Sequence, residues 1–309
     1  MVIFATVSDT VRVGIVLDLE TGATTEVACR PEFSDPTVIG RAPVRPFGIT
    51  WCDAELFVAN NRQILVFDAA LTYVRTLDTP RFVNTHQLAY RANRIWAASP
   101  WSDSLIGVAL DPAQTDLEFD LFRQRVIPYV PRPGHERDDV HHINSLLWAD
   151  GRLFVAAHNL GEPSFILCFD AERMRLAEMY SGAGHAIHGL ALRGDDLYWI
   201  SSRTNEIRSR AGFRFGLPRA GCARGLALGG ALLVVAISEH RSRIDRTDGD
   251  SWVLVIDLDA ACVVAEYELR GTGSINDLRL LDVPDAAHGL PPFWPQPALV
   301  TEERRPGRL

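Results

Sequence analysis

Short apolar runs separated by tight polar turns recur along the chain, and the pattern repeats six times. Each repeat opens with a polar or aromatic residue, enters an apolar run, turns through Asp, Asn or Gly, and continues into a second apolar run. Links of this composition between β-rich runs predict β-hairpins. The six opening segments are Phe47-Gly48-Ile49-Thr50-Trp51, His86-Gln87-Leu88-Ala89-Tyr90, Asn144-Ser145-Leu146-Leu147-Trp148, His188-Gly189-Leu190-Ala191-Leu192, Arg224-Gly225-Leu226-Ala227-Leu228 and Asn276-Asp277-Leu278-Arg279-Leu280.

The repeats extend beyond these hairpins. A third run ends at an aspartate, as in Val66-Phe67-Asp68 and Val255-Ile256-Asp257, and a fourth, more polar run follows it. Four strands per repeat, at intervals of 36 to 58 residues, are typical of the blades of a β-propeller. We therefore predict an all-β fold, a six-bladed β-propeller. A large sandwich or a β-solenoid is the alternative interpretation.

The sixth repeat contains only its opening strand, near the C-terminus. Three further runs, at residues 2–7, 12–18 and 24–29, stand at the N-terminus without an opening strand of their own. Pairing the two ends would complete the sixth blade and remove exposed strand edges. The sequence thus predicts a single propeller domain over residues 1–309. Residues 1–29 and 274–282 would form the closing blade, and residues 283–309 a proline-rich tail.

One position of the repeat is the candidate for chemistry. The residue that opens each innermost strand is expected to point into the central channel, and second strands end at the same face. This places five of the nine histidines on one face. The expected set is Phe47, His86, His142, Asn144, His158, His188, Arg203, Arg224, Glu239, His240, Asn276 and Asp277.

Histidines from different blades predict a metal site. Neutral imidazoles can hold Zn²⁺ or Fe²⁺ with an open position, where the metal polarises a substrate oxygen or activates water. His86 and His188 occupy equivalent positions two blades apart. His142 is the expected third ligand because it lies two residues before Asn144, on the same strand face; His158 and His240 remain alternatives.

The other residues of this face have expected roles around that metal. Arg224 would bind a carboxylate or an oxyanion, and Glu239 or Tyr129 would transfer a proton. Tyr129 belongs to a charged insertion, residues 123–140, that we expect to act as a lid over the mouth. Phe47, Asn144, Arg203, Asn276 and Asp277 are expected to bind substrate, and Asn144, Asn276 and Asp277 could also hold a structural Ca²⁺.

Composition narrows the function classes further. The formal charge of −8 gives no reason to expect nucleic acid as a partner, and no apolar run approaches membrane-spanning length. The chain has no lysine, which excludes a lysine Schiff base and a Walker-type phosphate loop. Five scattered cysteines and an N-terminus without a basic leader predict a cytoplasmic protein.

The blade pattern resembles the six-bladed NHL and gluconolactonase-type propellers over nearly the whole chain. Gluconolactonase-like members place a metal-binding glutamate near the start of the first blade, where this chain has Phe47. That departure argues against a lactonase. The set His86, His142, His188 and Arg224 is similar in kind to peptidyl-hydroxyglycine lyase, a propeller with zinc held by histidines and an arginine beside it.

The sequence therefore predicts a metal-dependent lyase or hydrolase that acts on a small polar or anionic metabolite at the channel mouth. An Fe(II) oxygenase using the same histidines is one alternative. A propeller that binds a ligand or a partner protein without catalysis is the other. The oligomeric state is not indicated by the sequence.

Overall fold

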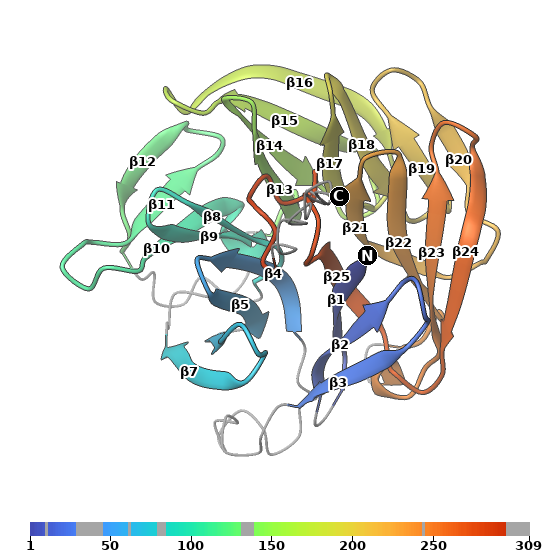
Figure 1. Ribbon diagram of the computed structural model, residues 1–309. Helices are drawn as coiled ribbons and strands as arrows, with labels where there is room; N and C mark the ends of the chain where they lie inside the picture. Colours follow the sequence, from blue (N-terminus) through green and yellow to red (C-terminus); the bar gives the residue numbers. More distant parts are fainter. Residues whose placement is uncertain are drawn as a thin grey trace, which may run out of the picture.

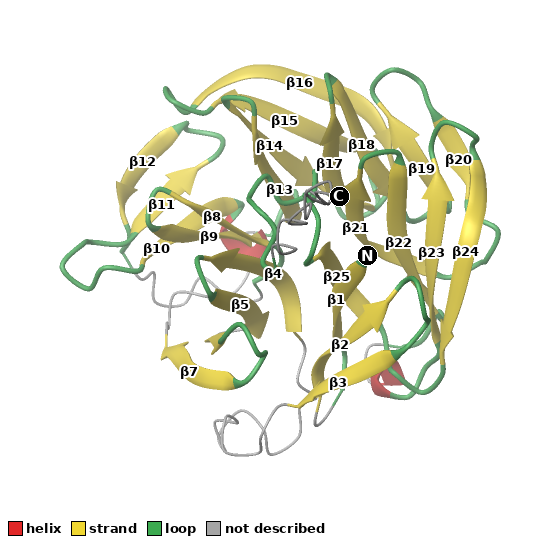
Figure 2. Cartoon of the chain, viewed as in Figure 1, coloured by secondary structure: helices red, strands yellow, loops and turns green. Residues whose placement is uncertain are grey.

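Six antiparallel sheets form a ring in the computed structural model, and the predicted six-bladed β-propeller is confirmed (Figure 1). The structure describes residues 1–9, 12–28, 46–60, 63–78, 85–130, 139–242 and 245–294. Nearly all regular structure in these ranges is strand, as Figure 2 shows, with short 3₁₀ helices at Pro100–Ser102 and Asp245–Thr247.

Blades one to three follow one another along the chain, each with its innermost strand first. Blade one comprises β4 (Pro46–Cys52), β5 (Glu55–Asn60), β6 (Gln63–Phe67) and β7 (Tyr73–Asp78). Blade two comprises β8 (Leu88–Arg91), β9 (Arg94–Ser99), β10 (Ser104–Ala109), β11 (Leu117–Asp120) and β12 (Arg125–Pro128). Blade three comprises β13 (Ile143–Ala149), β14 (Arg152–Ala157), β15 (Ser164–Asp170) and β16 (Arg175–Gly184).

Blades four and five repeat this order, and blade six joins the two ends of the chain. Blade four comprises β17 (Ile187–Arg193), β18 (Asp196–Ser201), β19 (Glu206–Ser209) and β20 (Arg214–Gly216). Blade five comprises β21 (Cys222–Gly229), β22 (Leu232–Ser238), β23 (Ser251–Asp257) and β24 (Cys262–Leu269). Blade six pairs β25 (Ile275–Leu280) with β1 (Val2–Val7), followed by β2 (Arg12–Asp18) and β3 (Thr24–Ala28).

The closing blade is therefore built as the sequence predicts. In its register Ile3 lies opposite Leu280 and Ala5 opposite Leu278, so the first strand of the chain lies beside the last. Blade two differs from the expectation, because part of the insertion at residues 123–140 forms β12, a fifth strand. Residues 131–138 of that insertion lie outside the described residues.

Six hydrophobic clusters fill the six interfaces between neighbouring blades. Successive residues of a strand contribute to different clusters: Leu153 and Val155 of β14 pack toward blade two, whereas Phe154 and Ala156 pack toward blade four. Side chains alternate between the two faces of a strand, and each blade has a neighbour on both faces. This is why the strands appear in the sequence as continuous apolar runs.

The segment after β25 crosses the end of the channel opposite the mouth, near the centre of the ring in Figure 1. Ala286 exchanges backbone hydrogen bonds with β17 and β21, through Leu192 (3.2 Å) and Leu228 (2.8 Å). His288 stacks on Trp51 of β4 with ring centroids 3.5 Å apart. Residues 281–294 therefore pack across this end of the propeller, with His288 buried.

Candidate functional site

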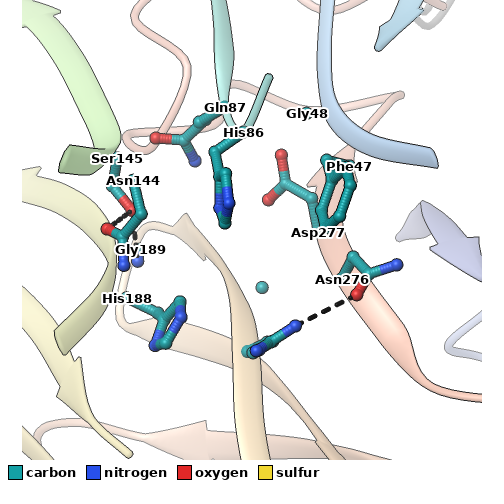
Figure 3. A pocket seen from close by; sticks show the side chains of 12 residues that line it. Phe47, Gly48, His86, Gln87, Asn144, Ser145, His188, Gly189, Asn276 and Asp277 are labelled. Carbon is teal, nitrogen blue, oxygen red and sulfur yellow. Dashed lines mark hydrogen bonds between the residues drawn. The ribbon is translucent and has the colours of Figure 1, made fainter. Parts of the chain in front are cut away.

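The residues that open the six innermost strands line one cavity at the mouth of the channel. Its lining consists of two consecutive residues from every blade, and it encloses about 340 Å³ of empty space, including space open to solvent. Figure 3 shows the labelled side chains around this space, with Phe47 and His86 adjacent and His188 on the side of Asn144. The lining is Phe47-Gly48, His86-Gln87, Asn144-Ser145, His188-Gly189, Arg224-Gly225 and Asn276-Asp277.

A break in strand register exposes these positions to the channel. The pairing of β17 with β18 skips Gly189, and that of β21 with β22 skips Gly225. Similar irregularities fall at Asn144 in β13 and beside Phe47 in β4. A β-bulge interrupts the ladder and re-aims a side chain, which explains why two consecutive residues of a strand reach the same cavity.

The second residue of each pair connects its blade to the next one, a pattern that the sequence analysis missed. Three of these residues are glycines, and a Cβ at Gly48 would lie 2.3 Å from the backbone nitrogen of Leu88 in the next blade. The other three accept a backbone N–H from the next blade. These acceptors are Gln87 Oε1 from Leu146 (2.8 Å), Ser145 Oγ from Gly189 (2.9 Å) and Asp277 Oδ2 from Ile49 (3.2 Å).

Five aromatic rings form a continuous row along the mouth, from blade one to blade four. Phe47 stacks on His86, with ring centroids 4.9 Å apart. The edge-to-face contacts that follow join His86 to His142 (5.0 Å), His142 to His158 (5.3 Å) and His158 to His188 (5.4 Å). We call this set the ring row. It contains the three predicted metal ligands, and it adds His158 between two of them.

Hydrogen bonds fix the orientation of two imidazoles in the ring row. His188 Nδ1 lies 2.9 Å from the carbonyl oxygen of Ala186, which can only accept, so this nitrogen carries the proton. His142 Nδ1 lies 2.9 Å from a carboxylate oxygen of Asp139. In the neutral form of both residues the lone pair is therefore at Nε2. Acceptors at the far nitrogen orient metal-binding histidines in this way.

The imidazoles at the blade-four end of the ring row are neutral at pH 7. Burial, together with the charge of Arg224, lowers the pKa of His188 well below its usual value. Burial and the neighbouring His142 and Arg224 lower the pKa of His158 to about 4. Neutral imidazole is the form that ligates metals.

The donor chemistry of the ring row fits a metal ion, but its imidazoles do not converge on one point. His158 Nδ1 is buried and has no hydrogen-bond partner among the described residues, so this nitrogen is a candidate metal ligand. Within the described parts of the chain, no three His, Cys, Asp or Glu side chains surround a common point as an ion requires. Binding of an ion by three of these imidazoles would thus need a rearrangement of side chains, which the hydrogen bonds of His142 and His188 oppose.

Arg224 and Asn276 occupy the remaining arc of the mouth, on blades five and six. Arg224 Nη1 donates to Asn276 Oδ1 at 3.2 Å, the dashed line that ends on Asn276 in Figure 3. Asn276 Nδ2 donates to Pro46 O (2.8 Å) and Ser8 Oγ (3.0 Å), which ties it to blade one and to the chain's first turn. Arg224 Nε is buried and has no partner among the described residues, so the guanidinium retains donor capacity.

Asp277, expected to bind substrate or Ca²⁺, is instead part of a buried ion pair. Its Oδ1 accepts from Arg279 Nη1 at 2.7 Å and from the Leu278 N–H at 3.0 Å. Burial raises the pKa of Asp277 to about 6, even though the charge of Arg279 opposes this shift. With its two oxygens already accepting three N–H groups, counting Ile49, Asp277 holds blade six against blade one.

Tyr129 does not lie at the mouth, and the prediction that it transfers a proton there is wrong. Its N–H donates to Asp116 O (2.9 Å), and Leu117 after Asp116 pairs with Pro128. Tyr129 and Asp116 therefore lie at the end of blade two that is farther from His86. The chain passes along β12 to that end before it returns to blade three, so the side chain packs in the apolar interface between blades one and two.

Three other expected residues lie at the mouth face but outside the central cavity. Glu239 and His240 line a neighbouring cavity, where Glu239 is paired with Arg241 (2.7 Å). Arg203 is exposed. Asn144 lines the central cavity, but its Nδ2 is engaged by Ile187 O (2.8 Å).

His142 reaches the site for a reason other than the expected strand periodicity. It precedes β13, which begins at Ile143, its φ is +51°, and its ring contacts that of His86. His141 points the other way, with its Nδ1 3.1 Å from Asp103.

The comparisons with known proteins support the fold but indicate neither a family nor an activity. No family model matches the sequence, and no curated protein matches it. Among solved structures, the chain is similar to one in a nidogen/laminin complex, with 11% identity, a TM-score of 0.63, and 90% of this chain and 97% of that one covered. A protein of unknown function from Bacteroides caccae has 10% identity and a TM-score of 0.59, with 90% and 97% covered. Apo AztD from Citrobacter koseri has 9% identity and a TM-score of 0.52, with 90% and 96% covered. At these identities the likeness concerns the propeller architecture alone.

No helix in the described ranges is long and apolar enough to cross a membrane.

Proposed function

We propose that this propeller is a metal-dependent enzyme, a lyase or hydrolase, that acts on a small anionic molecule at the channel mouth. One observation carries the proposal. Four imidazoles adjoin one another in the ring row, two of them with Nδ1 engaged and the lone pair at Nε2. Arg224 lies on the arc that the row leaves open.

The metal, Zn²⁺ or Fe²⁺, would be held by His86, His142 and His188, with His158 as the alternative third ligand. Such an ion would supply a polarised oxygen or an activated water. The His158 Nδ1 atom supports the alternative, because it is buried without a partner among the described residues. His240 is not favoured, since it is exposed and lies in the neighbouring cavity.

The chain's own residues would bind and orient the substrate. Arg224 is the permanent positive charge in the cavity lining, and its guanidinium would hold a carboxylate or oxyanion. Asn276 restrains that guanidinium through the Oδ1 contact. Phe47 provides an apolar surface at the blade-one end of the ring row. His142, fixed by Asp139, could accept a proton at Nε2 if it is not a metal ligand.

A second candidate is a propeller that binds an anionic ligand at Arg224 without a metal and without catalysis. The arrangement of the imidazoles favours it, because no three donor side chains of the described residues surround one point. An Fe(II) oxygenase would use the same imidazoles, so the bound element decides between oxygenase chemistry and lyase or hydrolase chemistry.

The test measures bound metal in protein purified without a histidine tag. We expect near-stoichiometric Zn or Fe by elemental mass spectrometry, its loss in His86→Ala/His188→Ala, and its retention in the control His240→Ala. Thermal unfolding with each divalent ion added provides a second measurement. If no ion binds the wild-type chain or raises its melting temperature, metal dependence is excluded and the ligand-binding propeller is the better description.

A further inference from the structure

The width of the central cavity is fixed by contacts between neighbouring blades. At three of the six junctions a glycine brings two strands together. A Cβ at Gly48 would lie 2.3 Å from the backbone nitrogen of Leu88, and one at Gly225 would lie 2.9 Å from that of Leu278. At the other three junctions a side chain accepts a backbone N–H from the next blade, at distances from 2.8 to 3.2 Å. The ring of blades therefore cannot widen around a ligand without breaking these close contacts.

The side chains that open the innermost strands decide how much room remains. The cavity encloses about 340 Å³, including space open to solvent, which is near the lower end of the volumes of small-molecule sites. Asn144, His188 and Asn276 are each held by a hydrogen bond to a backbone carbonyl oxygen. Phe47 stacks on His86 and offers a ligand only apolar atoms. Contact with Phe47 therefore selects a ligand by shape.

Phe47 lies on the side of the ring that faces Arg224. Contacts between the innermost strands join the blades in chain order, and in a ring of six blades the fifth lies opposite the second. Arg224 belongs to blade five, so an acid bound to it faces the stack of Phe47 on His86, from blades one and two. Asn276, the partner of Arg224, also donates to the carbonyl oxygen of Pro46, the residue before Phe47 (Figure 3). The carbon next to the bound acid group is therefore expected to meet the Phe47 ring.

The charge of Arg224 has no counter-ion within the described lining of the cavity. Asn276 Nδ2 donates to a carbonyl oxygen, so the atom that faces Arg224 is the neutral amide oxygen. Asp277 is the one carboxylate in that lining, and it is paired with Arg279 at 2.7 Å. A single positive charge without a partner suits a ligand with a single acid group.

We propose that the ligand is a monocarboxylate without branching at the carbon next to the acid group, and that Phe47 excludes wider acids. Phe47 is thus assigned as a specificity-determining residue of the mouth. The inference rests on the proposed role of Arg224 as the anion anchor, and it does not depend on the metal. It narrows the small anionic substrate to acids that are slender beside the carboxylate.

The experiment is a calorimetric titration of the full-length chain with acetate, propionate, isobutyrate and pivalate. These acids carry the same charge, and the carbon next to the carboxylate bears zero, one, two or three methyl groups. Burial alone would favour each added methyl group about fourfold. We expect the wild type instead to bind pivalate about tenfold or more weakly than propionate, because the walls and Phe47 leave no room for it.

Two substitutions at Phe47 and one control test the assignment. Phe47→Ala should bind pivalate at least as tightly as propionate, and Phe47→Leu, a smaller change in the packing of the mouth, should reduce the discrimination to a few-fold. Phe122→Ala is the matched control, because Phe122 is 46% exposed and lies outside the cavity lining. It should discriminate as the wild type does. Circular dichroism confirms that each variant is folded.

The outcomes separate this inference from the proposed function. Discrimination that is unchanged in both Phe47 variants would overturn the role of Phe47. Affinity that rises from acetate to pivalate in the wild type, and is lost in Arg224→Gln, would overturn the slender ligand and leave the anion anchor standing. Binding of none of the four acids would overturn this inference together with the role of Arg224, whereas the metal measurement would stand.

Discussion

Gly189 is the position where the architecture of the mouth can be tested most directly. Its φ is +65°, and a Cβ built on it would lie 2.6 Å from Leu226 Cβ in the next blade, where carbon atoms normally approach to about 3.5–4.0 Å. Leu226 is fully buried in the interface between blades four and five, and its Cβ cannot move without the backbone. Gly189→Ala must therefore separate two innermost strands.

The expected magnitude follows from two costs. A non-glycine residue in the left-handed region costs about 1–2 kcal/mol, and overpacking a close-packed site adds about 1–3 kcal/mol. Gly194 offers the matched control, because its φ is +58° and no atom lies within 4 Å of its built Cβ. Gly194→Ala should therefore incur only the cost of the left-handed conformation.

Urea unfolding at equilibrium measures both variants against the wild type. We expect Gly189→Ala to lose about 1–3 kcal/mol more unfolding free energy than Gly194→Ala, and to weaken ligand binding because the bulge that directs His188 is displaced. Equal losses in the two variants would refute the argument that close approach of the blades requires glycine after Phe47, His188 and Arg224.

Three further predictions test the burial of charges and the closed end of the channel. Between pH 6.5 and pH 4, His158 is mostly neutral in the folded protein and mostly protonated in the unfolded chain. Lowering the pH from 6.5 to 4 should therefore reduce the unfolding free energy of the wild type by up to about 3 kcal/mol more than that of His158→Asn. Parallel curves of unfolding free energy against pH for the two proteins would contradict this. Asp277→Ala should lose about 3–5 kcal/mol of unfolding free energy, because the substitution leaves Arg279 buried and without its ion-pair partner. Glu268→Ala breaks an exposed ion pair and should lose under about 1 kcal/mol in the same urea assay. Phe293→Ala should lose about 3 kcal/mol of unfolding free energy, since Phe293 is 5% exposed and packs in the interface between blades six and one. Val264, which is exposed, provides the control variant Val264→Ala. An equally small loss in both variants would show that residues 281–294 do not stabilise the propeller.

The architecture could be predicted because its determinants are local and repeat. Turns such as Asp150-Gly151 and Gly229-Gly230 fix each hairpin, and side-chain alternation on one strand fixes which residues share a face. The ring positions follow from the same register, so Phe47, His86, Asn144, His188, Arg224 and Asn276 could be aligned before any coordinates and line one cavity in the structure. Their roles in binding and catalysis remain predictions.

Contacts between blades could not be predicted in this way. The sequence predicted His142 as the third ligand and left His158 and His240 as alternatives, because all three lie beside a strand end at the same face. Only the structure places His142 and His158 in the ring row and His240 in the neighbouring cavity that Glu239 also lines. Tyr129 was misplaced because the fifth strand of blade two carries the chain to the opposite end.

The sequence by itself therefore determined the number of blades, the closure of the ring and the residues at the mouth, since period-two alternation and turn chemistry act over a few neighbouring residues. The tertiary structure alone decided which histidines touch, that Arg224 borders two cavities, and how residues 281–294 cover the far end of the channel. Those arrangements depend on packing between strands that are distant in the chain, for which one sequence carries no local signal.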